Sequence, residues 1–357
     1  MSTVIRRARL GDGLFAVTVA DNKITKIESE ADFATHAPAE NEIDAGGARL
    51  VPGLIDIHTH GMRGMDTMDG DNLAALAAAY LSVGTTTVYP TTVTASAEDI
   101  LAVLSQKTPE SGGACVPGFH VEGPYVNPRA AGAQDPDYIK NPDIAEFERF
   151  PNAAIVTVAP ELPDAMDFIK RTGASVAIGH TECDEATAVA AFRAGAKCLT
   201  HTCNRMPPLL HRDGGPIGAA ILEDAYAQVI SDGLHLGKSM VLALYRTFGV
   251  RRMILISDSM RATGMPDGQY MLGGLEITVK DGVARTAGGA LAGSTATLYD
   301  CVQKAISFGI PPEDAYAMAS TTPAEMLGLP KGKVEVGYDA EFLLLDEDWR
   351  LIRPLVL

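Results

Sequence analysis

The feature that most constrains this chain is the alternation, through its long middle section, of short apolar runs with helix-forming stretches. We interpret the apolar runs as buried strands: Leu54–His60, Thr85–Thr91, Gly118–Glu122, Ile155–Ala159, Ser175–His180, Cys198–His201, Gln228–Ser231 and Met253–Asp258. Strands separated by helices favour a parallel sheet. The pattern therefore predicts an α/β protein with a (β/α)8 barrel of the TIM type.

The stretches between these strands have the features of helices, because several of them begin with Asp or Ser, which commonly cap a helix N-terminus. The predicted helices are Asp71–Val83, Ser96–Gln106, Asp164–Thr172, Asp184–Ala194 and Lys238–Phe248. After the eighth strand, Gly273–Ala290 is predicted to form an extra hairpin.

Both ends of the chain are rich in strand-forming residues. Near the N-terminus the predicted strands are Thr3–Leu10, Leu14–Ala20 and Lys23–Glu28, and near the C-terminus Val334–Leu345 is predicted. We expect the two ends to meet in one small β-sandwich domain, because chain termini often lie close together. The predicted division is 1–50 and 329–357 for this small domain and 51–328 for the barrel.

Charge and composition narrow the range of partners. The net charge is −16, which argues against a nucleic-acid partner because phosphate backbones favour clustered Lys and Arg. The chain has no apolar run long enough for a membrane span and no signal-peptide pattern at its start. Its five cysteines include no Cys-x-x-Cys pair, which is typical of reduced thiols. We therefore expect a soluble, cytoplasmic enzyme.

His58 and His60 lie at the end of the first predicted strand of the barrel. Residues two apart on a strand point to the same side, so both imidazoles can face one point. Two converging imidazoles suit a borderline divalent metal such as zinc. Taken alone, the pair could equally be two polar residues at a strand end.

Other strand ends carry compatible groups, namely Glu122, His180, His201 and Asp258. Carboxyl ends of barrel strands converge on one face, so these side chains can meet across long sequence separations. Each has an ordinary alternative: a turn residue for Glu122, core histidines for His180 and His201, and a helix cap for Asp258. The set as a whole favours a metal site, with His120 as a supporting residue near Glu122.

Two residues are candidates for catalysis. A carboxylate at Asp258 can accept a proton from a metal-activated water and pass it to a leaving nitrogen. An amine leaves poorly unless it is protonated, so the second transfer is chemically required. His235 follows the seventh strand and could bind a substrate carbonyl or sugar, or simply occupy a loop at a helix start.

These motifs, taken in order, resemble the N-acetylglucosamine-6-phosphate deacetylases of the amidohydrolase superfamily. The matching segments, which extend over residues 3–346, are Pro52–Gly61, Tyr89–Thr92, Phe119–Tyr125, Gly179–Thr181, His201–Pro208, Ser231–His235, Ser257–Met260 and Leu291–Ser294. The resemblance implies hydrolysis of N-acetylglucosamine 6-phosphate to glucosamine 6-phosphate and acetate in amino-sugar catabolism.

The resemblance also implies roles for individual residues. Glu122, His180 and His201 would hold a divalent metal, zinc or iron. Some members use His58 and His60 for a second metal and others lack that pair, so the resemblance implies one or two ions here. Asp258 matches the catalytic acid/base, and Arg212 matches a phosphate-binding residue that in some members reaches across from a neighbouring subunit of a homodimer. The expected substrate contacts are Ala133, Gln134, Asn204, Arg205, Arg212, Asp232, Gly233, Leu234, His235, Leu291, Ala292 and Gly293.

The chain departs from the family pattern at a few positions. Arg205 replaces a common alanine, Gln134 replaces a histidine, and the segment after His211 also differs. The fourth strand ends without the lysine that bridges two metals in many amidohydrolases, which leaves Glu122 as the bridging candidate. Rival functions are deacetylation of N-acetylgalactosamine 6-phosphate, hydrolysis of a cyclic amide and an inactive sugar-phosphate sensor.

Overall fold

The computed structural model describes residues 2–35, 39 and 41–357. Its larger part is built on parallel strands in chain order. Six of them form one sheet: β10 (Phe119–Glu122), β11 (Ala153–Val158), β12 (Ser175–Ile178), β13 (Cys198–Leu199), β14 (Tyr226–Ile230) and β15 (Met253–Ile256). A second sheet pairs β6 (Leu54–Thr59) with β9 (Thr85–Pro90). The α/β class and all eight predicted strand positions are confirmed.

Hydrogen bonds join the two parallel sheets at both sides. Thr91, after β9, forms a parallel bridge with His120 of β10. On the other side the backbone N–H of Asp258, after β15, donates to the carbonyl of His58 in β6 (2.9 Å). The carboxyl ends of β6, β10 and β15 are therefore held next to one another, which is where the candidate site lies.

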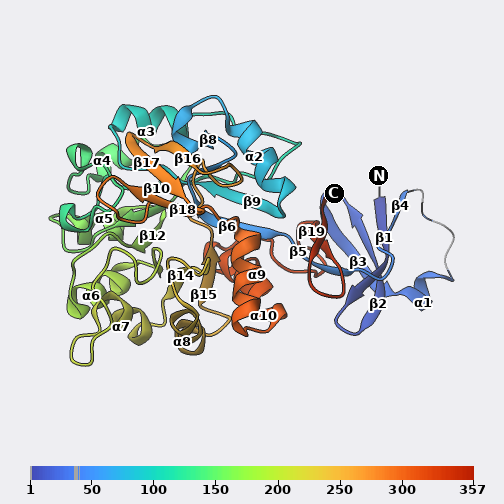
Figure 1. Cartoon of the computed structure of the whole chain (residues 1–357). Helices are drawn as coiled ribbons and strands as arrows, with labels where there is room; N and C mark the ends of the chain where they lie inside the picture. Colours follow the sequence, from blue (N-terminus) through green and yellow to red (C-terminus); the bar gives the residue numbers. More distant parts are fainter. Residues whose placement is uncertain (1, 36–38, 40) are drawn as a thin grey trace.

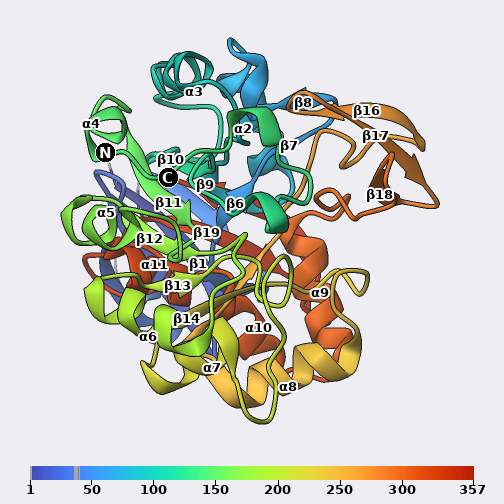
Figure 2. The ribbon, with the colours of Figure 1, turned by 90° about the vertical axis from the view of Figure 1, so that its left-hand side faces the viewer.

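Helices lie around these strands in Figures 1 and 2. Five lie where the sequence predicts them: α2 (Leu73–Ser82), α3 (Ala97–Leu104), α5 (Ala165–Arg171), α6 (Glu185–Ala194) and α8 (Lys238–Phe248). Others were not predicted: α4 (Ile144–Phe147), α7 (Gly215–Leu222), α9 (Leu298–Phe308), α10 (Pro312–Met318) and α11 (Thr321–Leu327). Ser96 and Asp184 cap α3 and α6 through their side chains, as expected.

Strands from both chain ends share one sheet, which forms the lobe on the right of Figure 1 where N and C are marked. Its strands are β1 (Ser2–Leu10), β2 (Gly13–Ala20), β3 (Lys23–Ser29), β4 (Asn41–Asp44), β5 (Arg49–Pro52), β19 (Glu341–Leu345) and β20 (Leu351–Val356), and the short α1 (Glu30–Phe33) follows β3. We call this lobe the β domain.

The strands of the β domain are hydrogen-bonded into one continuous sheet, because β1 pairs with β2 along one edge and with β4 and β5 along the other. The domain differs from the prediction in one respect: the predicted strand Val334–Leu345 is too long. Residues 334–340 form turns and bends around Gly337, which has a φ of +95° that favours glycine, and only β19 is extended.

The predicted hairpin after the eighth strand is part of a three-stranded antiparallel sheet of β16 (Gly268–Leu272), β17 (Leu275–Lys280) and β18 (Val283–Thr286). A smaller hairpin, β7 (Gly61–Met62) with β8 (Met65–Asp66), follows β6. The sheet of β16, β17 and β18 places Leu272 and the segment Leu291–Gly293 beside the carboxyl ends of the parallel strands.

The two parts of the molecule have separate apolar cores. In the α/β part every residue of β6 and β9 is buried, as expected for strands covered on both sides. The β domain packs a smaller cluster that includes Ile5, Leu50 and Phe342. Each large aliphatic or aromatic side chain so buried contributes about 1.5–3 kcal/mol. Within the described ranges, every helix is too short or too polar to cross a bilayer.

Candidate metal centre and substrate pocket

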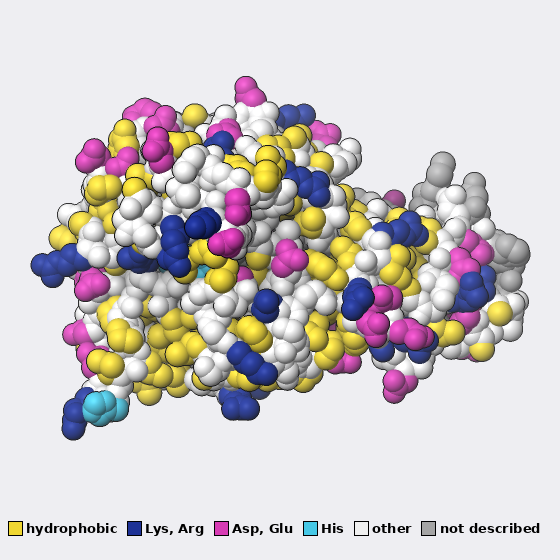
Figure 3. Space-filling model, in the orientation of Figure 1, with side chains coloured by type: hydrophobic (Ala, Val, Ile, Leu, Met, Phe, Trp, Pro, Cys, Tyr) yellow, Lys and Arg dark blue, Asp and Glu magenta, His cyan; other side chains and the backbone are white. Residues whose placement is uncertain are grey.

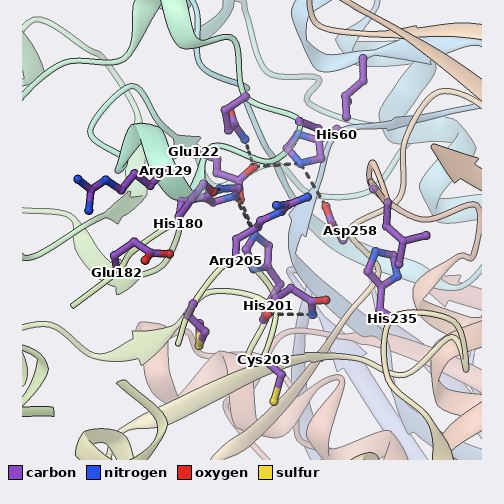
Figure 4. A pocket seen from close by; sticks show the side chains of 18 residues that line it. His60, Glu122, Arg129, His180, Glu182, His201, Cys203, Arg205, His235 and Asp258 are labelled. Carbon is purple, nitrogen blue, oxygen red and sulfur yellow. Dashed lines mark hydrogen bonds and ion pairs between the residues drawn. The ribbon is translucent and has the colours of Figure 1, made fainter. Parts of the chain in front are cut away.

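The polar residues predicted at the strand ends meet in one buried cluster. His58 and His60 come from the end of β6, Glu122 ends β10, and the others directly follow β12, β13 and β15: His180, His201 and Asp258. None of these side chains is more than 8% exposed. The structure therefore brings together all five predicted metal ligands and the predicted acid/base, as Figure 4 shows for those it labels.

Glu122 lies at the centre of this cluster. Its Oε1 atom is 3.3 Å from Nε2 of His58, and its Oε2 atom is 3.3 Å from Nε2 of His60. On the other side, Oε1 is 3.2 Å from Nε2 of His180 and 3.1 Å from Nε2 of His201. One carboxylate thus faces four imidazole nitrogens, as a bridging ligand must.

The orientation of the rings fits a cation. Three of the imidazoles have a hydrogen-bond acceptor on the Nδ1 side: Gln228 Oε1 for His58 (3.1 Å), the Thr91 carbonyl for His60 (3.1 Å) and the Ala130 carbonyl for His180 (2.9 Å). A ring that donates through Nδ1 keeps a lone pair on Nε2. Nε2 of His180 also lies 3.0 Å from Nε2 of His201. Several lone pairs and a carboxylate pointing at one another are the donors that a divalent metal prefers.

Two overlapping sets of residues can each hold an ion. One consists of Glu122, His180 and His201, and the other of His58, His60 and Glu122. We call the set of Glu122, His180 and His201 the distal half-site and the set of His58, His60 and Glu122 the proximal half-site. In each, the potential ligand atoms lie within 4.8 Å of one another. The donor set therefore fits one or two metal ions with nitrogen and oxygen ligands.

Burial and mutual charge shift the pKa values of these groups. Burial opposes ionisation of Glu122, but nearby His58 and His180 outweigh it, so its pKa lies well below the ordinary value. Burial also opposes protonation of His60, but hydrogen bonds with Asp258 and Glu122 outweigh it, so its pKa lies well above the ordinary value. In contrast, burial lowers the pKa of His201.

Asp258 lies beside the proximal half-site. Its Oδ1 atom is 3.2 Å from Nε2 of His60 and 3.6 Å from Nε2 of His58. Burial opposes ionisation, but the two histidines outweigh it and lower the pKa of Asp258 to about 2. The carboxylate is ionised at neutral pH and is able to accept a proton.

His235 is held by its neighbour Asp232. One oxygen of Asp232 accepts hydrogen bonds from the backbone N–H groups of Leu234 and His235 (both 2.8 Å), and the other faces Nδ1 of His235 (2.8 Å). Burial opposes protonation of His235, but the hydrogen bond with Asp232 outweighs it and raises the pKa. A protonated His235 can donate from Nε2 into the pocket.

The backbone is strained at three residues of the cluster. His180, His201 and Asp258 have φ values of +47°, +26° and +49°, in or near the left-handed region that non-glycine residues rarely adopt. Such conformations cost about 1–3 kcal/mol each and are concentrated at functional sites. Here they turn the chain sharply at the strand ends and direct the side chains inward.

The cluster forms the floor of a cavity of about 370 Å³. Of the predicted substrate contacts, seven line it: Ala133, Gln134, Asn204, Arg205, His235, Leu291 and Gly293. Gln134 also donates from Nε2 to Oε2 of Glu122 (2.8 Å).

Five of the predicted contacts are absent from the cavity wall: Arg212, Asp232, Gly233, Leu234 and Ala292. Asp232 acts through His235 instead. Arg212 is exposed and lies against His211, so within a single chain it does not reach the cavity. Ala292 is fully buried in the small core under β16–β18. Gly233 and Leu234 turn outward, and the side chain of Leu234 is exposed.

Sequence reasoning missed several wall residues: Arg129, Ala130, Glu182, Cys203, Met206 and Leu272. Arg129 and Arg205 supply positive charge to an acidic protein, and both are labelled in Figure 4. Figure 3 shows Lys and Arg side chains gathered near the middle of one face of the α/β part. The signal that could have identified Arg129 is its position seven residues after Glu122, within the loop that also carries Ala133 and Gln134.

His120, predicted to support Glu122, contacts His58 of the proximal half-site. Its ring packs edge-on against His58, with centroids 4.6 Å apart. Its Nδ1 lies 2.9 Å from the carbonyl of Ile57, and its Nε2 lies 2.8 Å from the hydroxyl of Thr157. Burial holds the pKa of His120 well below the ordinary value, so the ring is neutral and structural.

Comparison with known proteins agrees with this geometry. The model of the amidohydrolase family matches residues 49–355. The chain belongs to the amidohydrolase family. It is 39% identical to the N-acetylglucosamine-6-phosphate deacetylase of Vibrio furnissii, over 95% of this chain and 89% of that one. It is also 36% identical to an N-acetylgalactosamine-6-phosphate deacetylase of Escherichia coli O157:H7, over 92% of this chain and 89% of that one.

Solved structures show the same likeness. The N-acetyl-D-glucosamine-6-phosphate deacetylase of Mycobacterium smegmatis is 31% identical, with a TM-score of 0.87 over 99% of this chain and 98% of that one. The N-acetylglucosamine-6-phosphate deacetylase of Thermotoga maritima is 30% identical, with a TM-score of 0.86 over 100% of this chain and 98% of that one. The family resemblance inferred from the motifs is thus confirmed.

Proposed function

We propose that this protein hydrolyses N-acetylglucosamine 6-phosphate to glucosamine 6-phosphate and acetate. The observation that carries the proposal is the cluster of Glu122, His180 and His201, with Asp258 beside it, on the floor of a polar cavity. The relatives described above, three of which are named as deacetylases of this substrate, support the assignment.

We further infer that the two parallel sheets together form one (β/α)8 barrel. The bridge between Thr91 and His120 on one side, and the hydrogen bond between Asp258 and His58 on the other, support it. The β domain, assigned to 1–50 and 329–357, then lies at the opposite end of the barrel from the metal cluster.

A divalent metal, zinc or iron, would be held by the distal half-site, and a second ion by the proximal half-site. Such a metal supplies Lewis acidity, which makes a water nucleophilic near neutral pH and polarises the amide carbonyl. The remaining chemistry belongs to the chain. Asp258 is ionised, takes the proton of the attacking water and returns it to the amide nitrogen, so that the amine leaves in a neutral form.

Positive side chains around the mouth would hold the substrate's phosphate. Arg129 and Arg205 line the cavity, and His235, whose pKa is raised by Asp232, would donate toward the substrate's carbonyl or sugar oxygens when protonated. Asn204 and the segment Leu291–Gly293 close around the sugar. Arg212 would complete the phosphate site from a neighbouring subunit, and we therefore propose a homodimer. We also propose that it is cytoplasmic.

The alternative substrate is N-acetylgalactosamine 6-phosphate. The Escherichia coli relative, which is a deacetylase of that sugar phosphate, supports this alternative. The two sugars differ at one hydroxyl. Comparison of kcat/KM on both sugars tests the choice, and we expect the gluco substrate to be preferred. A higher value on the galacto substrate would reverse the assignment while keeping the chemistry.

An inactive sugar-phosphate sensor is the non-enzymatic alternative. The complete cluster argues against it, since a sensor has no need of the acid/base Asp258. Acetate release measured together with the metal-to-protein ratio separates the two. Metal-loaded protein that binds the sugar phosphate but releases no acetate would support the sensor.

A further inference from the structure

A second cavity lies at the end of the parallel strands opposite to the metal cluster. It has a volume of about 270 Å³ and is formed between the β domain and helix α10. Pro52, just before β6, lines this cavity, whereas His60, just after β6, lines the first. A strand of this length is about 20 Å long, so the two cavities are distinct sites. We call the second one the basal crevice.

Two arginines face the basal crevice from adjacent strands. Arg9 of β1 and Arg49 of β5 are direct partners in the parallel register, so their side chains project from the same side of the sheet. Like charges in opposite positions on a sheet repel and destabilise it. Neither arginine forms an ion pair with any described residue, so the repulsion is not relieved within the chain.

The donors of these arginines are largely unused. Arg49 lies over the ring of Trp349, with its guanidinium carbon 4.5 Å from the ring centroid, which holds the group in place. Its Nε atom is buried and has no hydrogen-bond partner. Arg9 makes one long hydrogen bond, from Nε to the carbonyl of Gly47 (3.3 Å). A buried donor without a partner is unfavourable, and a ligand that accepts from it would remove that cost.

Other polar groups of the crevice wall are already satisfied by the chain. The hydroxyl of Tyr316 donates to the carbonyl of Trp349 (2.9 Å), and that of Ser320 donates to the carbonyl of Tyr316 (2.7 Å). The hydroxyl of Thr321 donates to the carbonyl of Gly332 (2.6 Å). Among the described side chains that line the crevice, the arginines therefore supply the charged donors, and Glu313 is an acidic group without an ion pair.

We propose that the basal crevice binds a small phosphate-bearing molecule through Arg9 and Arg49. A phosphate dianion neutralises two adjacent guanidinium groups, and their planar forks match its oxygens better than they match a monovalent anion. Glu313 would accept a hydrogen bond from a hydroxyl or amine on the rest of the ligand. The volume admits a molecule about the size of a sugar phosphate.

Trp349 provides a direct test, because it is the only tryptophan of the chain. Its fluorescence is followed in the metal-loaded protein during titration with inorganic phosphate, and separately with glucose 6-phosphate, which has no acetyl group to lose. Ionic strength is kept constant with chloride. We expect a saturable change in emission at concentrations up to about 10 mM.

The variants Arg9→Met and Arg49→Met locate the site. Arg9→Met leaves the stacking of Arg49 on Trp349 in place, and we expect it to weaken binding at least about tenfold. Arg49→Met should abolish the response. Arg353→Met, which removes the same charge from an exposed position of β20 outside the crevice, should titrate like the wild type. Deacetylation without added ligand should be unchanged in all three.

Two results would overturn the proposal: no saturable change in the wild type, or titration of Arg9→Met and Arg49→Met indistinguishable from that of the wild type. If the proposal holds, the relative affinities of the two probes identify the source of the phosphate. Tighter binding of glucose 6-phosphate indicates a phosphorylated metabolite, and tighter binding of inorganic phosphate indicates the free ion.

Discussion

The two half-sites of the metal centre share Glu122 but differ in the origin and the surroundings of their histidines. The proximal half-site takes both histidines from the end of one strand, His58 within β6 and His60 just after it, and faces a second carboxylate, Asp258. The distal half-site takes its histidines from the ends of two strands and has Glu122 as its carboxylate. The pKa of His60 is raised in the first, and that of His201 is lowered in the second.

This difference indicates that the two half-sites have different roles in metal binding and proton transfer. In the distal half-site the imidazoles face a single carboxylate, and burial lowers the pKa of His201, so we expect it to hold the ion more tightly. The proximal half-site can bind a metal, and Asp258 beside it can accept and donate a proton. His58 and His60 fix the position of Asp258. Mutations in the two half-sites should therefore have different effects on metal content and on turnover.

The largest effect is expected for Glu122→Gln, because both half-sites lose their shared ligand. The metal-to-protein ratio should fall close to zero, and activity should fall by about a thousandfold or more, since the metal contributes several kcal/mol to the transition state. Glu98→Gln, an equal change of charge in the exposed first turn of α3, is the control. A Glu122→Gln protein with full metal content would contradict the bridging role.

Asp258→Asn separates proton transfer from metal binding. We expect kcat to fall by about a hundredfold to ten-thousandfold, the usual contribution of a general acid/base, while metal content and substrate affinity are kept. Metal analysis and isothermal titration with substrate check the two retained properties. Turnover near the wild-type rate would show that another group transfers the proton.

The comparison of His180→Gln with His60→Gln tests which half-site binds more tightly. His180→Gln should remove most of the metal, whereas His60→Gln should retain the ion of the distal half-site and lose about tenfold to a hundredfold in activity, an effect typical of a perturbed metal environment. Metal content is measured after dialysis against a weak chelator. If His60→Gln loses its metal first, the order of the half-sites is reversed.

Asp232→Asn should produce the smallest effect, seen mainly in the pH dependence. Asp232 raises the pKa of His235, so the protonated imidazole persists as the pH rises until that raised pKa is passed. Loss of the carboxylate lowers this pKa, and the alkaline limb of the kcat/KM profile should move to lower pH. An unchanged alkaline limb would show that protonated His235 has no part in substrate binding.

Much of this centre could be predicted from the sequence, because strand-end positions in a parallel α/β protein follow from local patterns. His58 and His60 have the two-residue spacing of a strand, and His180 and His201 end apolar runs. Arg129 could not be found in this way, because a loop brings it to the cavity and loops lack periodicity. The proposed role of Arg212 depends on a second chain, which one sequence does not describe.

The fold was less predictable where local signals conflict with tertiary structure. Strand β20 contains Pro354, which argues against a strand, yet β20 lies at the edge of its sheet, where a missing N–H is tolerated. Helix α7 begins with Gly215 and Pro216 and is buried over most of its length, so it lacks the amphipathic pattern of a surface helix. The structures of both β20 and α7 depend on tertiary packing, which a local sequence pattern does not describe.

The left-handed backbone at His180, His201 and Asp258 has a consequence for how this protein would evolve in the laboratory. Glycine would adopt those φ values without strain, so replacing any of the three would relax the chain locally while destroying the centre. Selection for heat resistance alone should therefore accumulate changes at these positions. Selection that also demands turnover should keep them and gain its stability elsewhere.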